Sequence, residues 1–94
     1  MEKEMFSEKK LQLENGDNII LHYFITKTTK GYEEGKEQIY GVEIAKHCDN
    51  LLVESENVYG ITDNHEDILY LVNKISEHYV MPSSLLNVVD DFTL

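Results

Sequence analysis

The period of the apolar residues changes once along the chain, close to residue 63. Before that point apolar and polar residues alternate, which is typical of half-buried β-strands, and after it the apolar residues recur at helical spacing. Four alternating segments come before the change, over residues 6–14, 18–28, 37–47 and 51–59. The pattern predicts a single α+β domain over residues 1–94, in which a four-stranded antiparallel meander sheet is followed by helices.

The first two segments flank Asn15-Gly16, a pair that is typical of tight β-hairpin turns. One face of the second segment is unbroken and apolar, and its residues all have odd numbers: Ile19, Leu21, Tyr23 and Ile25. The late apolar residues of the first segment, Leu11 and Leu13, are odd as well. Residues that pair directly across two strands share a face, so odd residues must pair with odd ones. This requires a loop with an odd number of residues. We therefore expect a three-residue loop over 14–16, with Gly16 in the left-handed conformation and Leu11 opposite Ile19.

The third and fourth segments need a different loop. A charged connection with two glycines, over residues 30–36, leads to the third segment and is expected to be a mobile loop. The turn at Asp49-Asn50 then joins segments in which even residues face odd ones. That parity suits a loop of two or four residues, and the four-residue version would place Ile44 opposite Val53.

The helical part begins with a capping signal. Asp63 fits an N-cap, and Glu66 would complete a capping box. Apolar residues then follow at helical spacing, at Ile68, Leu71, Val72, Ile75 and Tyr79. This predicts an amphipathic helix from Asp63 to Tyr79, packed on the sheet. Pro82 should stop it, because the residue before a proline avoids helical geometry.

The segment after Pro82 could be part of the core or a docking peptide. Ser83 is a good N-cap for a short second helix, and four apolar residues fall on one side of it: Leu85, Leu86, Val89 and Phe92. Burying them would contribute roughly 6–12 kcal/mol before entropy is subtracted, at about 1.5–3 kcal/mol each. That is comparable to the whole stability of a small domain. We therefore expect these side chains to be buried against the same chain, in a fold of order ββββαα.

The second face of the sheet raises the question of a partner. If the odd residues of the segment 18–28 lie under the helix, the opposite face carries Ile20, His22 and Phe24, with Thr26 beyond them. Their expected neighbours are Phe6, Ile39, Leu52 and Val58. Such a face is too apolar to be fully wet, and one long helix cannot cover both faces. We expect either the C-terminal segment or, preferably, a second copy in a symmetric homodimer to cover Ile20 and Phe24.

The charge of the chain argues against several classes of partner. Eighteen acidic residues stand against eight basic ones, all of them lysine, and the formal net charge is −10. Nucleic-acid phosphates and anionic membrane surfaces repel such a chain, and no arginine is present to read phosphate or guanine. The N-terminal residues contain no apolar run of the signal-peptide type, and no apolar stretch is long enough to span a membrane. We expect a small acidic cytoplasmic protein in which Cys48, the single cysteine, is a reduced thiol.

Candidate chemistry is sparse in this sequence. His47-Cys48-Asp49 and His65 with its acidic neighbours lack the spacing of zinc motifs. No serine lies in a nucleophile elbow, and Asp49 should raise the pKa of the Cys48 thiol. We therefore assign no catalytic, cofactor-binding or metal residues and expect no enzyme activity.

Two functional classes remain. The first is a non-catalytic protein–protein interaction module, which binds an unknown protein partner or itself. The second is a small-ligand-binding protein with a pocket between sheet and helices, using tyrosines and His22 as polar groups. A deep pocket lined by Tyr23, Tyr40 or Tyr59 would favour the second class. A flat apolar patch around Ile20 and Phe24 would favour the first.

The C-terminal half also resembles a known family. The stretches "IYGVEIAK", "VYGIT" and "VMPSSLLNVVDDF", with an amphipathic helix between the last two, are similar to short clostridial (Firmicutes) proteins that form a domain of unknown function. The matching residues are Tyr40, Gly41, Val42 and Glu43, then Val80, Pro82, Leu85, Val88, Asp90, Asp91 and Phe92. The resemblance covers residues 37–92. It implies a compact cytosolic protein of a Gram-positive anaerobe and carries no activity or cofactor.

Overall fold

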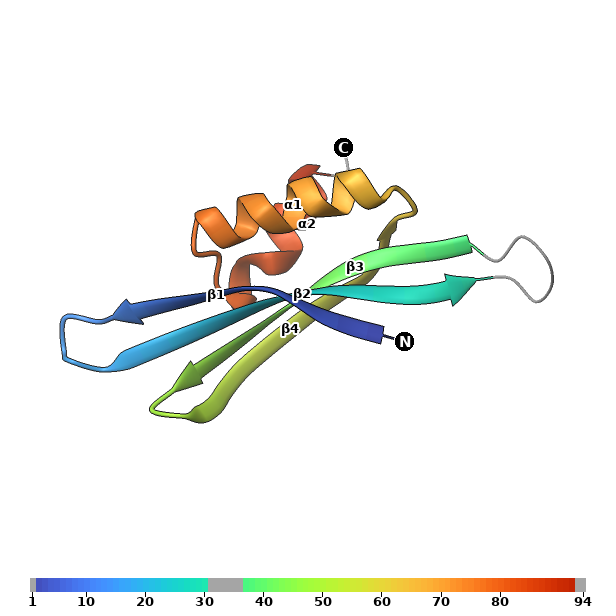
Figure 1. Cartoon of the computed structure of the whole chain (residues 1–94). Helices are drawn as coiled ribbons and strands as arrows, with labels where there is room; N and C mark the ends of the chain where they lie inside the picture. Colours follow the sequence, from blue (N-terminus) through green and yellow to red (C-terminus); the bar gives the residue numbers. More distant parts are fainter. Residues whose placement is uncertain (1, 31–36, 93–94) are drawn as a thin grey trace.

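The chain folds into one sheet with a helical layer on one side. The structure, a computed structural model, describes residues 2–30 and 37–92. One antiparallel sheet in chain order contains the strands β1 (Glu2–Gln12), β2 (Asn18–Lys30), β3 (Glu37–Cys48) and β4 (Leu51–Thr62). Helix α1 (His65–Glu77), the 3-10 turn η1 (Pro82–Ser84) and helix α2 (Leu85–Phe92) follow. The predicted α+β meander with two C-terminal helices is confirmed, and Figure 1 shows both helices on the same side of the sheet.

The first hairpin has the predicted register. Leu11 lies opposite Ile19, and the pairing of Leu13 with Asp17 leaves a loop of three residues. The Leu13 amide donates to the Asp17 carbonyl at 2.8 Å, and the Gly16 amide donates to the Leu13 carbonyl at 2.9 Å. Gly16 has a φ of +92°, which glycine adopts without a steric penalty. The parity of the apolar residues therefore predicted this hairpin correctly.

The second hairpin uses the shorter of the two expected loops. Cys48 pairs with Leu51, so the loop is Asp49-Asn50, with φ values of 51° and 70° as a type I′ turn requires. A bulge follows at Val53, after which even residues of β3 face even residues of β4. Ile44 therefore lies opposite Glu56, and the expected contact with Val53 is wrong. Of the expected loop over 30–36, residue 30 ends β2 and residues 31–36 lie outside the described part.

A second bulge in β4 depends on a glycine of β3. Tyr40 pairs with Thr62 and Val42 pairs with Val58, so three residues of β4 face Gly41 alone. A Cβ atom on Gly41 would overlap the Val58 carbonyl and would lie 2.7 Å from Oγ1 of Thr26. Because that backbone approach leaves no room for a side chain, only glycine fits here.

The N-cap of helix α1 lies one residue later than predicted. The Asn64 side chain accepts a hydrogen bond from the Asp67 amide at 3.0 Å, so Asn64 is the N-cap. The assignment of Asp63 as the cap, with Glu66 as its partner, is wrong. The reason lies in the end of β4, because the Thr62 hydroxyl accepts from the Asn64 amide at 3.1 Å. This contact carries the chain one residue further before the helix begins.

The end of α1 also differs from the prediction. The Val80 amide donates to the Ile75 carbonyl at 3.0 Å and the Tyr79 amide to the Ser76 carbonyl at 3.2 Å. Tyr79 has a φ of +53°, so this is a Schellman-type ending in which a tyrosine takes the left-handed position. The helix therefore ends at Glu77, before Pro82 can act on it.

Pro82 instead opens the η1 turn, and Met81 is its N-cap residue. The prediction that Ser83 caps the second helix is therefore wrong. Pro82 is buried, Leu85 is 0% exposed, Val89 is 4% exposed, and Phe92 is half-buried against the core. The segment is part of the core, as predicted.

Leu86 is the exception in this segment, because its side chain is 57% exposed. Adjacent helical residues are about 100° apart around the axis, so Leu86 turns to solvent when Leu85 faces the sheet. Val88 takes the partly buried place instead. The predicted burial of Leu86 is wrong.

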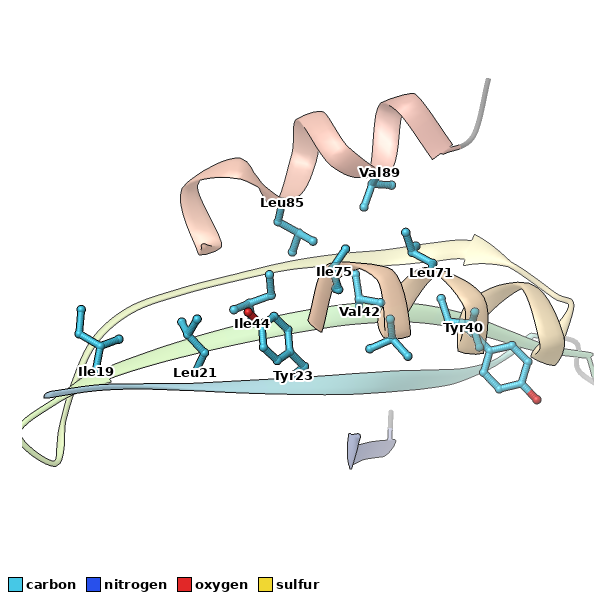
Figure 2. Packing of buried hydrophobic residues seen from close by; sticks show 12 residues of the cluster. Ile19, Leu21, Tyr23, Tyr40, Val42, Ile44, Leu71, Ile75, Leu85 and Val89 are labelled. Atoms are coloured by element: carbon cyan, nitrogen blue, oxygen red, sulfur yellow. The ribbon is translucent and has the colours of Figure 1, made fainter. Parts of the chain in front are cut away.

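The core lies between the sheet and the two helices. Figure 2 shows Leu85 and Val89 pointing from α2 toward Val42 and Ile44 of the sheet. Tyr23 is 0% exposed there, and its hydroxyl donates to the Val80 carbonyl at 3.0 Å. The two helices therefore cover one face of the sheet and do not cover the opposite face (Figure 1). We call this opposite face the far face.

Candidate interaction face

The predicted interaction residues lie together on the far face. Leu21 and Tyr23 of β2 are fully buried under the helices, so the alternate residues Ile20, His22 and Phe24 point the other way. All three are half-buried although neither helix covers them. Their partners on β3 include His47 opposite Ile20 and Ala45 opposite His22, and Leu52 of β4 lies opposite His47. We call the set Ile20, His22, Phe24, Ala45, His47 and Leu52 the far-face patch.

Two of the four expected neighbours are on this face and two are not. Leu52 belongs to the patch, and Ile39 pairs with Thr28 on the same face. Val58 pairs with Val42 and packs against the core, so its placement on the far face was wrong. Phe6 sits in a bulge of β1 between Met5 and Ser7 and lines a hollow beside α1. Both errors come from bulges, which reset the alternation of a strand.

Two histidines lie within the patch and line its groove. Nε2 of His22 lies 2.9 Å from Oε2 of Glu8, and this hydrogen bond lowers the pKa of Glu8. The rings of His22 and His47 are 5.0 Å apart between centroids. Nδ1 of His47 is buried and, among the described residues, has no hydrogen-bond partner. A buried polar atom without a hydrogen-bond partner is uncommon in folded proteins and calls for an explanation.

The charges on this face balance. Nζ of Lys3 forms an ion pair with Glu43 at 2.9 Å and lies 4.6 Å from the centroid of the Phe24 ring. Strand pairing places Lys10 and Glu8 on the same face, with 3.8 Å between Nζ of Lys10 and Oε1 of Glu8. Around the far-face patch, these two lysines and two glutamates thus offset each other, in a chain whose net charge is −10.

The far face is shallow rather than deep. A groove of about 470 Å³ runs across it, lined by Lys3, His22, Phe24, Glu43, Ala45, His47, Leu52 and Ser55. Leu52 is 59% exposed at its rim. An open groove with an apolar floor is better suited to a protein surface than to an enclosed small molecule.

A second hollow lies between the sheet and the start of α1. It has a volume of about 300 Å³ and is lined by Glu4, Met5, Phe6, Ile25, His65 and Leu69. The tyrosines expected in such a pocket do not line it. Tyr23 is fully buried and bonded to Val80, Tyr40 is 8% exposed with its ring against His65, and Tyr59 is 46% exposed.

The residues considered for chemistry are scattered. Among residues 2–30 and 37–92, no group of three or more His, Cys, Asp or Glu side chains is placed to share a metal ion. Burial, and then the neighbouring Asp49, raises the pKa of the Cys48 thiol, as expected from the sequence. A thiol with a raised pKa is a poor nucleophile at neutral pH. The same part of the chain has no helix with the length and apolar composition needed to cross a membrane.

His47 was not among the residues predicted for the interaction face. It was considered only as a metal ligand, beside Cys48 and Asp49. Its place depends on the register between β2 and β3, in which odd residues of β3 lie opposite even residues of β2. His47 then falls opposite Ile20 and next to His22.

A family model matches nearly the whole chain. The model of the family of unknown function DUF6514 matches residues 2–94. The match includes the first hairpin, which the resemblance over residues 37–92 did not. No curated protein and no solved structure matches the chain.

Proposed function

The chain belongs to the DUF6514 family, and we propose that it is a non-catalytic protein–protein interaction module that acts as a symmetric homodimer through its far face. The observation that carries this proposal is the far-face patch itself. Its apolar centre, with Ile20 and Phe24, is left without a covering element by the residues that the structure describes. Self-association is the commonest way for a chain to bury such a face.

The size of the face supports a second copy as the occupant. The molecule measures 53 × 26 × 17 Å, and the sheet extends along its long axis (Figure 1). A face of this outline exceeds the roughly 800 Å² that each partner contributes to an interface of standard size. Two such faces can pack as two aligned sheets, about 10 Å apart.

The charge distribution supports the same occupant. Two chains of charge −10 repel each other, so they can associate only where the local charge is small. The far face meets this condition, because Lys3 is paired with Glu43 and Lys10 lies near Glu8. Acidic residues of the other surfaces would then stay outside the interface.

Light scattering at micromolar concentration tests the proposal. We expect the mass of two chains for the native protein and of one chain for the variants Phe24→Glu and Leu52→Glu. Leu52 is exposed, so its substitution leaves the fold intact. Tyr70→Glu, at an exposed aromatic residue of α1, is the matched control and should remain dimeric. A native protein that is monomeric at these concentrations would refute the homodimer.

Small-ligand binding is the second candidate function, and the hollow beside α1 favours it. Four apolar side chains line this hollow, with Glu4 and His65 as polar groups. Its volume of about 300 Å³ is at the lower end for ligand sites. Leu69→Trp would fill the hollow, so it should abolish ligand binding and leave a far-face dimer intact.

Location and origin complete the proposal. We place the protein in the cytoplasm because it has one cysteine and therefore no internal disulfide. The similarity of residues 37–92 to clostridial proteins leads us to propose a Firmicutes origin.

A further inference from the structure

We propose that protonation of the histidine pair His22–His47 dissociates the far-face dimer, so that acidification releases the two chains. This inference rests on the homodimer proposed above and adds its regulation. The pair lies in the groove of the far face, with 5.0 Å between ring centroids, and both side chains line that groove. A second copy seated on this face would cover both rings.

The two histidines differ in the partners available for a positive charge. Protonated His22 has a carboxylate partner, because its Nε2 lies 2.9 Å from Oε2 of Glu8. Glu43, the carboxylate that lines the groove, is paired with Lys3 at 2.9 Å. Neither acid is therefore left for His47, whose Nδ1 is buried and has no hydrogen-bond partner in the described part of the chain.

The strands around His47 leave it no unpaired carboxylate, since Glu43 of its own strand β3 is paired with Lys3. β1 brings Lys3 and Lys10 together with Glu8, whose Oε2 is used by His22. β2 brings His22 itself, and β4 brings the uncharged Leu52 and Ser55. In a covered interface, a protonated His47 would be desolvated and would face a protonated His22. The dimer therefore binds fewer protons than two separate chains.

The sign of the pH effect follows from this difference. Imidazoles gain their charge between about pH 8 and pH 5, so acidification over this range favours the state that binds more protons, which is the monomer. General electrostatics predicts the opposite sign. Added protons reduce the charge of −10 per chain and so weaken the repulsion between chains. The direction of the change therefore distinguishes histidine control from charge reduction.

Sedimentation equilibrium at constant ionic strength tests the inference on the full chain. Between about pH 7.5 and about pH 5.5, we expect the dimer dissociation constant to rise by about tenfold or more, since each proton taken up changes it by up to tenfold per pH unit. His47→Gln should remove most of this rise and still give a dimer at neutral pH. His78→Gln, at the exposed C-cap residue of α1, should keep this pH response.

The outcomes separate this inference from the proposed function. A dimer whose dissociation constant stays constant or falls on acidification overturns histidine control and leaves the homodimer standing. A pH response that survives in His47→Gln also overturns it. A native chain that is monomeric at neutral pH refutes the homodimer and, with it, the regulation.

Discussion

Tyr23 links the sheet to the helical layer. Its ring is fully buried, and its hydroxyl donates to the carbonyl of Val80, in the segment between α1 and η1. Burial, and then the neighbouring Tyr79, raises the pKa of Tyr23 to about 12. The folded state therefore holds the neutral phenol, because a phenolate could not donate this bond. The interaction stabilises the fold fully below the unfolded-state pKa near 10, and the contribution is lost as the pH rises toward 12.

Tyr23→Phe tests this account. At neutral pH the free energy of unfolding should fall by about 1–2 kcal/mol, because the Val80 carbonyl loses its donor. Between pH 10 and 12 the native protein should lose roughly 2 kcal/mol that the variant does not lose, so the difference between them should vanish or reverse. Guanidinium unfolding of both proteins at several pH values measures it, and the other tyrosines cancel in the comparison. A difference that is independent of pH would contradict the assigned role.

Single residues also show where sequence reasoning reaches its limit. Asp63 and Asn64 are both good N-cap residues, and the choice between them depended on a hydrogen bond from the Asn64 amide to the Thr62 hydroxyl. In the candidate site, Ile20, His22 and Phe24 followed from alternation along one strand. His47 was missed because its place depends on pairing between two strands, which composition and period do not specify.

At the scale of elements, periodicity predicted the four strands, two helices and the first register. Alternation holds only while strands are regular, and three irregularities interrupt it. They lie at Phe6 in β1, at Val53 in β4, and opposite Gly41. A bulge changes the stability of the fold through the side-chain packing around it, so its position depends on the tertiary structure. For this reason the sides taken by Phe6 and Val58 could not be predicted.

The short helix α2 gives the element-scale prediction. Leu85 is fully buried in the shared core, whereas Leu86, the next residue, is 57% exposed. Leu85→Ala should lower the free energy of unfolding by about 2–5 kcal/mol, because it leaves a cavity. Leu86→Ala is the matched control and should change it by less than about 0.5 kcal/mol. Urea unfolding of both variants measures the contrast, and equal effects would contradict the observed orientation of α2.

At the scale of the whole molecule, the two faces of the sheet have different requirements. The apolar side chains of the helix-bearing face are buried within the chain, since Leu85 and Val89 pack in one core with Ile19 and Leu21. The far face keeps paired charges around an apolar centre, while the chain as a whole carries −10. A dimer built on that face would be held by apolar contact and opposed by long-range repulsion. These two contributions respond differently to salt.

Salt should therefore strengthen the proposed dimer. Screening shortens the range of repulsion between two acidic chains, with a Debye length near 10 Å at 0.1 M, and leaves apolar contact almost unchanged. From about 20 mM to about 300 mM NaCl, we expect the dissociation constant to fall by about three- to tenfold. Sedimentation equilibrium at neutral pH measures this, with Leu52→Glu as a monomeric reference. A dimer that weakens with salt would mean that ion pairs between chains hold it, for example through Lys3 and Lys10, and that the apolar centre around Phe24 is not its main contact.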